Sequence, residues 1–506
     1  MLLRALLLLL LTAFAAWPVW TLPDLDGTEG RRVQIALEMA QGDWLVPTLG
    51  RVPTWAKPPL HYWLLGLANQ WFGSGVLALR LPGVLAAFVA AFVAGELLRR
   101  SFGPRAGWIG ALGIATAPIV LFEWPSAEID PVFASFTAIS LWCLAVGVAR
   151  ERRALLVVAG TVGGLAVLAK GPPYLVFAAG AWLVWFRHRR LRGLFAYLAP
   201  LFAVVLAYYV PMWVTRVAPG EMLAVAGEES LGRLSFVTWH SVRTIPEFWL
   251  RAVLVQLPLV LWCFWEWRGA RDARMDASDL TLRMCSGAAV VAVAVLTFFP
   301  GRPTRYLLPN VLLFTFAVAP AVAHFAAFRG PLPAFANRAI AGVGAVGALA
   351  LCVLPFVPGV GAGALGLAAM AGAAPLLCRT PGRAVAGCLV LPIVAAWTLG
   401  QERTWSWLDG ARSRRSAAAV LQRELGQRNA AADLQTAGHF DSPLLLAAGL
   451  LPPGDESGRL PWRAGWVLHE VDTWPPVTAP PHYATRLRLD LPFKSFALCE
   501  RIAEPK

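Results

Sequence analysis

Long apolar runs, separated by short polar segments, fill the chain from residue 1 to about residue 400. Many of these runs have the roughly 20 residues that a helix needs to cross a bilayer, and they contain few charges. The pattern predicts an all-α polytopic membrane protein with about 13 transmembrane helices. The expected spans are 1–20, 76–98, 106–123, 130–149, 154–169, 172–186, 194–215, 248–267, 284–299, 306–327, 338–357, 359–378 and 384–400.

Two further helices are expected in the 21–75 segment, between the first two spans. Residues 29–41 carry apolar side chains at helical spacing, and residues 59–72 form a second apolar stretch that is rich in aromatic side chains. Such segments are typical of interfacial helices that lie on the membrane surface. A solvent-exposed helical hairpin is the alternative.

The last hundred residues differ in composition from the rest. Residues 401–506 contain more charge and proline, and no apolar run there is long enough to span a bilayer. The pattern of 417–427 is helical, whereas 466–471 and 483–491 alternate as strands do. We predict a small C-terminal α/β domain that follows a transmembrane domain, 1–400.

Charge is scarce and placed asymmetrically. Charged residues make up 15% of the chain, against about 25% in an average soluble domain. The arginines gather in alternate loops, which the positive-inside rule assigns to the cytoplasm. An odd number of spans then puts 21–75, the 217–247 loop and the C-terminal domain on the outer side. We therefore expect a multi-pass membrane protein whose C-terminal domain lies on the outer side of the membrane. The net charge of +14 follows from these arginines and does not indicate nucleic acid.

Two further features concern processing and redox chemistry. The first apolar run, after Arg4, could also be a cleaved signal peptide, but an uncleaved first span preserves the parity of the others. Six of the seven cysteines lie in or beside predicted spans, and only Cys499 lies in the tail. No disulfide framework is expected.

Lysine is rare in this chain and is placed beside proline. Only four of the 44 basic residues are lysines, and two of them stand in Lys57-Pro58-Pro59 and Lys170-Gly171-Pro172-Pro173. A lysine is a compact point charge on a flexible stem, which suits a phosphate oxygen in a confined site. Snorkelling at the membrane edge is the alternative for either one.

Polar residues from five distant places in the sequence fall at the outer ends of the predicted spans. Such residues are functional candidates. Cations could grip a phosphate leaving group, while a carboxylate orients or deprotonates an acceptor hydroxyl. The set comprises Asp26, Thr28, Glu29, Arg31, Lys57, Glu128, Asp130, Lys170, Glu228, Glu229, Arg233, His240, Arg243, Arg302, Arg305 and Tyr306.

At these residues the chain resembles the bacterial aminoarabinose lipid A transferases, which belong to the protein mannosyltransferase-like superfamily of GT-C glycosyltransferases. The resemblance covers about residues 1–330 and is carried by an ordered set of motifs. They are 26–31 (DGTEGR), 36–39 (ALEM), 42–47 (GDWLVP), 57–63 (KPPLHYW), 130–131 (DP), 170–172 (KGP) and 305–309 (RYLLP).

The resemblance implies a polyprenyl-phosphate-sugar donor, transfer at the outer face of the membrane, and inversion at the anomeric carbon. By position, Asp130 matches a functional acid of the family and Lys57 its interfacial lysine. Interfacial anchoring is the alternative for Arg31 and Tyr306, and helix capping for Asp130. The residues expected to bind the donor phosphate are Arg31, Lys57, Lys170, Arg233, Arg305 and Tyr306.

One departure from the family affects catalysis. Thr28 stands where the family has an aspartate, so Asp26 or Glu29 would have to supply that carboxylate. The expected catalytic residues are therefore Asp26, Glu29 and Asp130.

Two other departures affect metal binding. Ala56 and Ser230 replace residues that are associated with a metal site in the lipid A enzymes, and His61 and His240 lack partners at metal-ligand spacing. We expect no zinc and no cofactor. A transient divalent cation on the donor phosphate stays open.

The sequence thus predicts an inverting glycosyltransferase that moves a sugar from a polyprenyl phosphate to a lipid, glycan or protein acceptor. One alternative is a transporter or flippase of a lipid-linked anion, which would tend to carry repeats and polar residues near the bilayer midplane. Another is a catalytically inactive lipid-binding relative, which Thr28 makes credible. The sugar, the acceptor, the role of the tail and the oligomeric state do not follow from the sequence.

Overall fold

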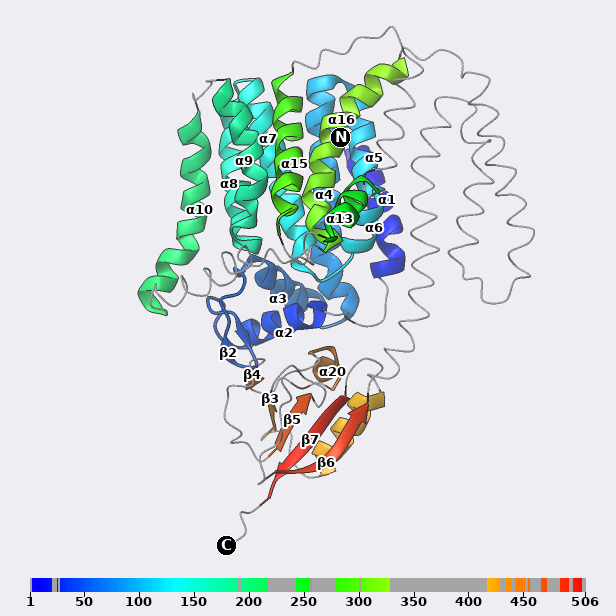
Figure 1. Ribbon diagram of the computed structural model, residues 1–506, viewed down its shortest axis with the longest axis vertical. Coiled ribbons are helices and arrows are strands. Elements are labelled where there is room, and N and C mark those ends of the chain that lie inside the picture. Colours follow the sequence, from blue (N-terminus) through cyan, green and yellow to red (C-terminus); the bar gives the residue numbers. More distant parts are fainter. Residues whose placement is uncertain are drawn as a thin grey trace, which may run out of the picture. The chain divides into compact units, whose positions relative to one another are not determined.

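In the computed structural model, the chain forms two compact units (Figure 1). The first unit comprises 1–20, 56–60 and 80–402, and the second comprises 21–55, 61–79 and 403–506. Most of the segment between the first two predicted spans therefore clusters with the C-terminal residues, whereas 56–60 belongs to the first unit. The structure describes 2–20, 25, 28–188, 193–216, 243–254, 256, 279–299, 303–327, 416–427, 434–437, 442–448, 450, 454–455, 466–470, 483–490 and 495–502.

The first unit is helical in its described part. Its elements are α1 (Leu2–Trp20), α4 (Val76–Phe102), α5 (Pro104–Ala115), α6 (Pro118–Glu123), α7 (Ile129–Ala149), α8 (Arg153–Lys170), α9 (Pro173–Arg187), α10 (Leu194–Thr215), α13 (Ile245–Leu254), α15 (Leu280–Leu296), the 3₁₀ turn η1 (Thr304–Leu307) and α16 (Leu308–Ala327).

Five segments of the described chain are long and apolar enough to cross a bilayer: Val76–Phe102, Ile129–Ala149, Arg153–Lys170, Leu194–Thr215 and Thr304–His324. The predicted helical membrane architecture is confirmed, as is a small C-terminal domain that contains strands. The number of 13 spans stays a prediction, because 338–357, 359–378 and 384–400 lie outside the described residues.

The span expected at 106–123 is not one helix. It is split into α5 and α6, because α5 ends at Ala115 and Pro118 begins a new helix. Proline lacks the N–H that a continuous helix would need at this place, but it fits the first position of a helix. The prediction of a single uninterrupted span was wrong here.

Helix α7 lies at the centre of the first unit, among α8, α15 and α16 (Figure 1). Every residue from Ile129 to Val148 except Phe136 is buried. A buried hydroxyl chain ties this helix to its neighbours: Ser140 Oγ donates to the Ala159 carbonyl of α8 at 2.7 Å and lies 2.8 Å from the Tyr174 hydroxyl of α9. The Tyr174 hydroxyl lies 2.7 Å from that of Tyr197 in α10. Hydrogen bonds of this kind fix the rotation of helices whose remaining contacts are apolar.

The second unit begins with the two helices predicted from 29–41 and 59–72. They are α2 (Thr28–Gln41) and α3 (Leu60–Phe72), and a short hairpin of β1 (Thr48–Leu49) and β2 (Val52–Pro53) connects them. The Trp63 indole of α3 donates to the Trp44 carbonyl at 2.7 Å.

Glu38 holds the hairpin turn from α2. The turn residues Gly50 and Arg51 both have a φ of 63°, which suits a two-residue hairpin but is unfavourable for a residue with a side chain. The Glu38 carboxylate, only 8% exposed, accepts hydrogen bonds from the Gly50 N–H at 2.9 Å and the Arg51 N–H at 2.8 Å. Gln34 adds a third donor at 2.9 Å. The charge on Glu38 thus offsets the cost of the turn.

The C-terminal residues of this unit form a five-stranded sheet in the order β4-β3-β5-β7-β6. Its strands are β3 (Leu434–Ala437), β4 (Gly454–Asp455), β5 (Trp466–Glu470), β6 (Tyr483–Asp490) and β7 (Ser495–Arg501). The pairs β3–β4 and β3–β5 are parallel, whereas β5–β7 and β6–β7 are antiparallel.

Two of these strands match the predicted ones at 466–471 and 483–491, and 416–427 is helical. Burial in β7 raises the pKa of the Cys499 thiol, so this free cysteine is poorly reactive. Helix α20 (Ser442–Ala447) packs against α2, so α2 has a protein partner on one face.

Replacing Glu38 with alanine removes the acceptor for two backbone N–H groups, and hydrogen bonds to a charged group contribute about 1.5–3 kcal/mol each. We expect Glu38→Ala to open the hairpin, so that trypsin cleaves after the exposed Arg51 on the order of 10 times faster. Gln34→Ala, which leaves both backbone contacts, is the matched control. Equal cleavage of the wild type and Glu38→Ala would contradict this function of Glu38.

Candidate active site

The candidate site lies where the start of α7 meets the end of α8. These helices run antiparallel because only a short turn at 150–152 joins them at their other ends. Asp130 lies in the first turn of α7, and Lys170 is the last residue of α8. A carboxylate at a helix N-terminus and a cation at a C-terminus are both favoured by the helix dipole. The local sequence therefore brings opposite charges together.

Asp130 and Lys170 form a nearly buried ion pair. The Lys170 ammonium donates to Asp130 Oδ1, and the two side chains are 10% and 8% exposed, respectively. The same ammonium lies 4.1 Å from the centre of the Tyr306 ring and 5.3 Å from that of Phe133. The ring faces attract the cation, so Lys170 is held by one carboxylate and two aromatic rings.

Arg305 reaches the same carboxylate from η1. Its Nε lies 3.5 Å from Asp130 Oδ2, and its Nη1 lies 3.8 Å from Glu128 Oε1. The Arg305 side chain is 33% exposed, whereas that of Glu128 is only 8% exposed. Arg305 is therefore the cation of this group that an incoming anion reaches first.

The Lys57 loop lies beside this cluster. Gly171, which ends α8 directly after Lys170, has a φ of +87° and can turn the chain where a side chain would be strained. A Cβ atom on Gly171 would lie 3.7 Å from the Pro58 ring. The two lysine–proline motifs, which are separated by more than a hundred residues in the sequence, are therefore neighbours in the first unit.

A second layer supports the turn that carries Glu128 and Asp130. Gly83 of α4 lies so close to this turn that an added Cβ would be 2.2 Å from the Trp124 carbonyl oxygen and 2.8 Å from that of Ser126. Arg80, one helical turn earlier on α4, is only 1% exposed. A buried arginine needs compensating polar partners. The sequence signal for Arg80 was an arginine inside an otherwise apolar run.

The remaining predicted site residues belong to other parts of the chain. Glu29, 4% exposed in the first turn of α2, and Arg31 in its second turn belong to the second unit. Asp26 and Arg233 lie outside the described residues. Glu128 was noted in the sequence without a role, and the structure shows it beside Arg305.

No group of three or more histidine, cysteine, aspartate or glutamate side chains that could hold a metal ion occurs in the described part of the chain. Ala56, at one of the two positions associated with a metal in related enzymes, has no ligating atom. The expected absence of zinc stays a prediction.

The charges of the described cluster balance one another. Lys170 and Arg305 supply two positive charges, and Asp130 and Glu128 supply two negative ones. A dianionic phosphate would need a further cation close by, and Lys57 stands in the adjacent loop. The arrangement can hold a phosphate if the cations turn from the carboxylates toward it.

Comparison with known proteins shows which family and which individual proteins this chain is similar to. Residues 56–214 match the dolichyl-phosphate-mannose-protein mannosyltransferase family. An undecaprenyl phosphate-α-4-amino-4-deoxy-L-arabinose arabinosyl transferase of Edwardsiella ictaluri is 31% identical over 201 residues, which cover 38% of this chain and 36% of that protein. The same-named protein of Pseudomonas savastanoi is 26% identical over 359 residues, 65% of this chain and 62% of that protein. The chain thus covers less than two thirds of the length of either relative.

The fold has a solved counterpart over almost its full length. ArnT from Cupriavidus metallidurans, in a crystal structure bound to undecaprenyl phosphate, has a TM-score of 0.70 at 17% identity and covers 99% of both chains. The apo structure of the same protein has a TM-score of 0.68. Together, the family match, the curated relatives and the shared fold support the resemblance that the sequence motifs indicated.

The close contact at Gly83 gives a direct test of the second layer. We expect Gly83→Ala to push α4 away from the turn at Trp124, at a cost of about 1–3 kcal/mol, which is the usual range for overpacking. Thermal unfolding of the purified protein should show a lower midpoint than the wild type. Gly75→Ala, where an added Cβ meets nothing within 4 Å, is the control and should leave the midpoint unchanged. An equal midpoint for both variants would show that the contact at Gly83 is relaxed.

Proposed function

We propose that this chain, which shares the fold of ArnT from Cupriavidus metallidurans, transfers a sugar from a polyprenyl phosphate to an acceptor at the outer face of the membrane. The reaction inverts the configuration at the anomeric carbon. The donor belongs to the undecaprenyl-phosphate-linked sugars named for its relatives, and the acceptor is a lipid, glycan or protein.

The Lys170 cluster is the observation that carries this proposal. One ammonium and one guanidinium converge on a carboxylate at the ends of three membrane helices. Cations in such a place suit an anion that is anchored in the membrane, because the lipid tail can stay between helices while the phosphate reaches the helix ends. Arginine grips phosphate through its planar fork, and lysine neutralises it as a point charge.

The chemistry of the transfer requires charge stabilisation at the leaving group. An acceptor oxygen forms a bond to the anomeric carbon while the bond from that carbon to the phosphate oxygen breaks. The electron pair of the broken bond stays on the polyprenyl phosphate, which gains a negative charge. Lys170, Arg305 and Lys57 would stabilise this charge as it develops, which is commonly the largest catalytic contribution.

The carboxylates have different expected roles. Asp130 already accepts from Lys170 and lies beside Arg305, so it is suited to positioning these cations. Glu29 and Asp26 stand near the position of the missing family aspartate and are the candidates for orienting or deprotonating an acceptor hydroxyl. An acceptor that is itself a phosphate would need no strong base. No resident metal or cofactor is proposed.

The orientation of the protein in the membrane is inferred from the charges at the two ends of the helices. The cluster lies at one end of α7 and α8, and Arg99, Arg100, Arg150, Arg152 and Arg153 lie at the other end of the same helices and of α4. The positive-inside rule puts these arginines in the cytoplasm. We therefore propose an inner-membrane protein whose site faces the periplasm. A flippase is disfavoured because the charges of the described cluster lie at helix ends and not near the middle of the bilayer.

Arg305→Gln is the first test of donor binding, because this side chain is partly exposed and its loss leaves the Lys170–Asp130 pair intact. Undecaprenyl phosphate should bind the variant on the order of 10- to 100-fold more weakly, as expected for a charge-assisted hydrogen bond of about 1.5–3 kcal/mol. Binding is measured by native mass spectrometry of the purified protein in detergent.

Two variants complete this test. Arg153→Gln, at the opposite end of α8, is the matched control and should bind as the wild type does. Lys170→Met with Asp130→Asn removes both buried charges together, so that no unpaired charge is left to unfold the protein, and it should also bind poorly. Wild-type affinity in Arg305→Gln and in the double variant would refute a phosphate site at this cluster.

Asp26→Asn, Glu29→Gln and Asp130→Asn separate the roles of the carboxylates. If the acceptor is a hydroxyl, at least one of them should lose turnover by roughly 100-fold or more at retained donor binding, the usual scale for a positioned acid or base. Mass spectrometry of glycolipids and glycoproteins from cells with each variant, the wild type, or no copy of this chain gives the readout. Full turnover in all three would favour a phosphate acceptor, whereas no product even with the wild type would favour a non-enzymatic lipid-binding role.

A further inference from the structure

A large cavity lies at the arginine-rich end of the helices. It has a volume of about 670 Å³ and is lined by the α4–α5 connection, the end of α7, the start of α15 and the last turns of α16. This size is within the range of ligand pockets, about 300–1,000 Å³. Its principal lining residues are Phe102, Arg105, Arg150, Asp279, Leu282 and His324.

This cavity is distinct from the Lys170 cluster. Arg150 directly follows α7, whereas Asp130 lies in the first turn of that helix. A helix of this length separates its ends by about 30 Å, at 1.5 Å per residue. A ligand in one place therefore does not touch the other.

Positive charge prevails at this cavity. Arg105 is exposed in the first turn of α5. The N-cap residue of this helix is Gly103, so no side chain caps the helix. The positive end of the helix dipole therefore adds to the charge of the arginine. Arg150 donates to the Ser101 carbonyl at 3.2 Å and lies 3.9 Å from Asp279 Oδ2. The other oxygen of Asp279 accepts from the Thr281 N–H at 2.8 Å and caps α15. The described lining of the cavity thus contains two guanidinium groups and one carboxylate.

We infer that this cavity binds a phosphate group, carried by an anionic membrane lipid or by a small soluble phosphate. Two arginines from different elements can grip phosphate oxygens, while Phe102, Leu282 and Pro320 supply an apolar wall. Basic pockets between transmembrane helices on the cytoplasmic side are typical places for phosphate head groups. The inference is independent of the proposed transfer reaction.

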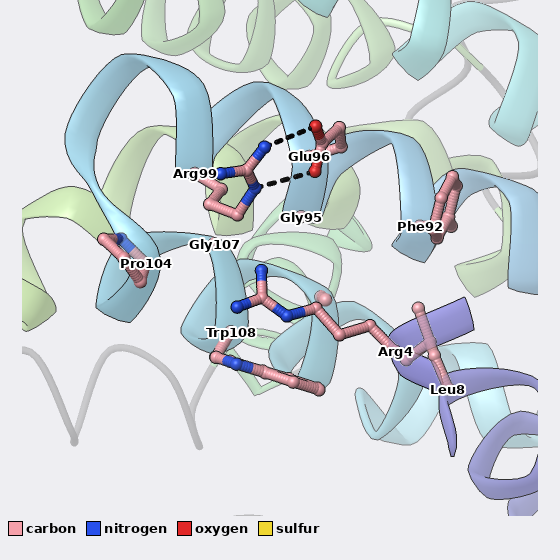
Figure 2. Close-up of a pocket in the computed structure, with 10 residues that line it drawn as sticks. Arg4, Leu8, Phe92, Gly95, Glu96, Arg99, Pro104, Gly107 and Trp108 are labelled. Carbon is pink, nitrogen blue, oxygen red and sulfur yellow. Dashed lines mark hydrogen bonds and ion pairs between the residues drawn. The ribbon is translucent and has the colours of Figure 1, made fainter. Parts of the chain in front are cut away.

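A neighbouring pocket does not have these properties. Figure 2 shows Arg4, Glu96, Arg99 and Trp108 around it, with Arg99 bound to both oxygens of Glu96. Arg100 also donates to Glu96, at 2.6 Å, and Arg4 lies over the Trp108 ring at 5.8 Å. Its volume is only about 40 Å³. The cations there already have partners, and the space is too small for a phosphate head group. The larger cavity is therefore the candidate site.

The test measures binding to the full-length protein, purified in detergent, by native mass spectrometry and thermal shift. Phosphatidylglycerol, phosphatidylcholine and inorganic phosphate are the three probes. We expect Arg105→Gln and Arg150→Gln each to weaken the binding of a phosphate probe on the order of 10-fold, as the loss of one charge-assisted contact predicts. Arg153→Gln, at the same end of the helices but outside the cavity, should have no effect.

The probes distinguish the two sources of phosphate. Binding of phosphatidylglycerol that exceeds that of phosphatidylcholine and depends on Arg105 identifies a lipid head group. Binding of inorganic phosphate with the same dependence identifies a soluble phosphate. The Arg150→Gln variant loses the contact with Ser101, and this loss could destabilise the fold. Because Arg105 is exposed, Arg105→Gln should fold normally, and the test rests on that variant. The inference would be overturned if the wild type and Arg105→Gln bound each of the three probes with the same affinity.

Discussion

The nearly buried ion pair between Lys170 and Asp130 is the interaction on which the rest of the site depends. Removing two charges from water is costly, and the loss of one partner from a buried pair typically costs about 3–5 kcal/mol. The pair persists because both helix dipoles favour it and because the Tyr306 and Phe133 rings face the ammonium. A stability role alone would be served as well by apolar side chains, so the buried charges fit the proposed role in donor binding.

The surrounding architecture keeps this pair at the ends of the helices. Gly171 turns the chain directly after Lys170 and lets the Lys57 loop approach, and Gly83 lets α4 reach the turn that carries Glu128. The buried α7 connects these contacts to the core of the first unit. The cluster is neutral without a ligand, which makes its cations available to a phosphate without leaving an uncompensated charge between binding events.

Much of the architecture could be predicted from the sequence, because apolar runs of membrane length and helical periodicity are strong local signals. The ranges of α2, α3, α7 and α10 agree with the predicted helices to within two residues. The split of 106–123 at Pro118 was missed, since a proline inside an apolar run can kink a helix or end it. The order of the strands around β7 depends on pairing between distant segments, which periodicity does not encode.

Several residues of the described cluster, but not their pairing, could be singled out from the sequence. Rare lysines next to proline, and polar residues at helix ends, indicated Asp130, Lys170, Arg305 and Tyr306. Which carboxylate holds which cation depends on rotamers and on the approach of η1 to α7. The roles of Glu128 and Glu38 follow from tertiary contacts, and a single sequence carries only weak signals for them.

The most direct test of the central claim is an experimental structure of this protein with undecaprenyl phosphate. We expect the phosphate to contact the Lys170 ammonium and the Arg305 guanidinium, with Arg305 drawn away from Asp130 beyond its present 3.5 Å. The polyprenyl tail should run along the membrane helices from that point. A phosphate bound elsewhere, with the Lys170–Asp130–Arg305 contacts unchanged, would contradict the assignment of this cluster as the donor site.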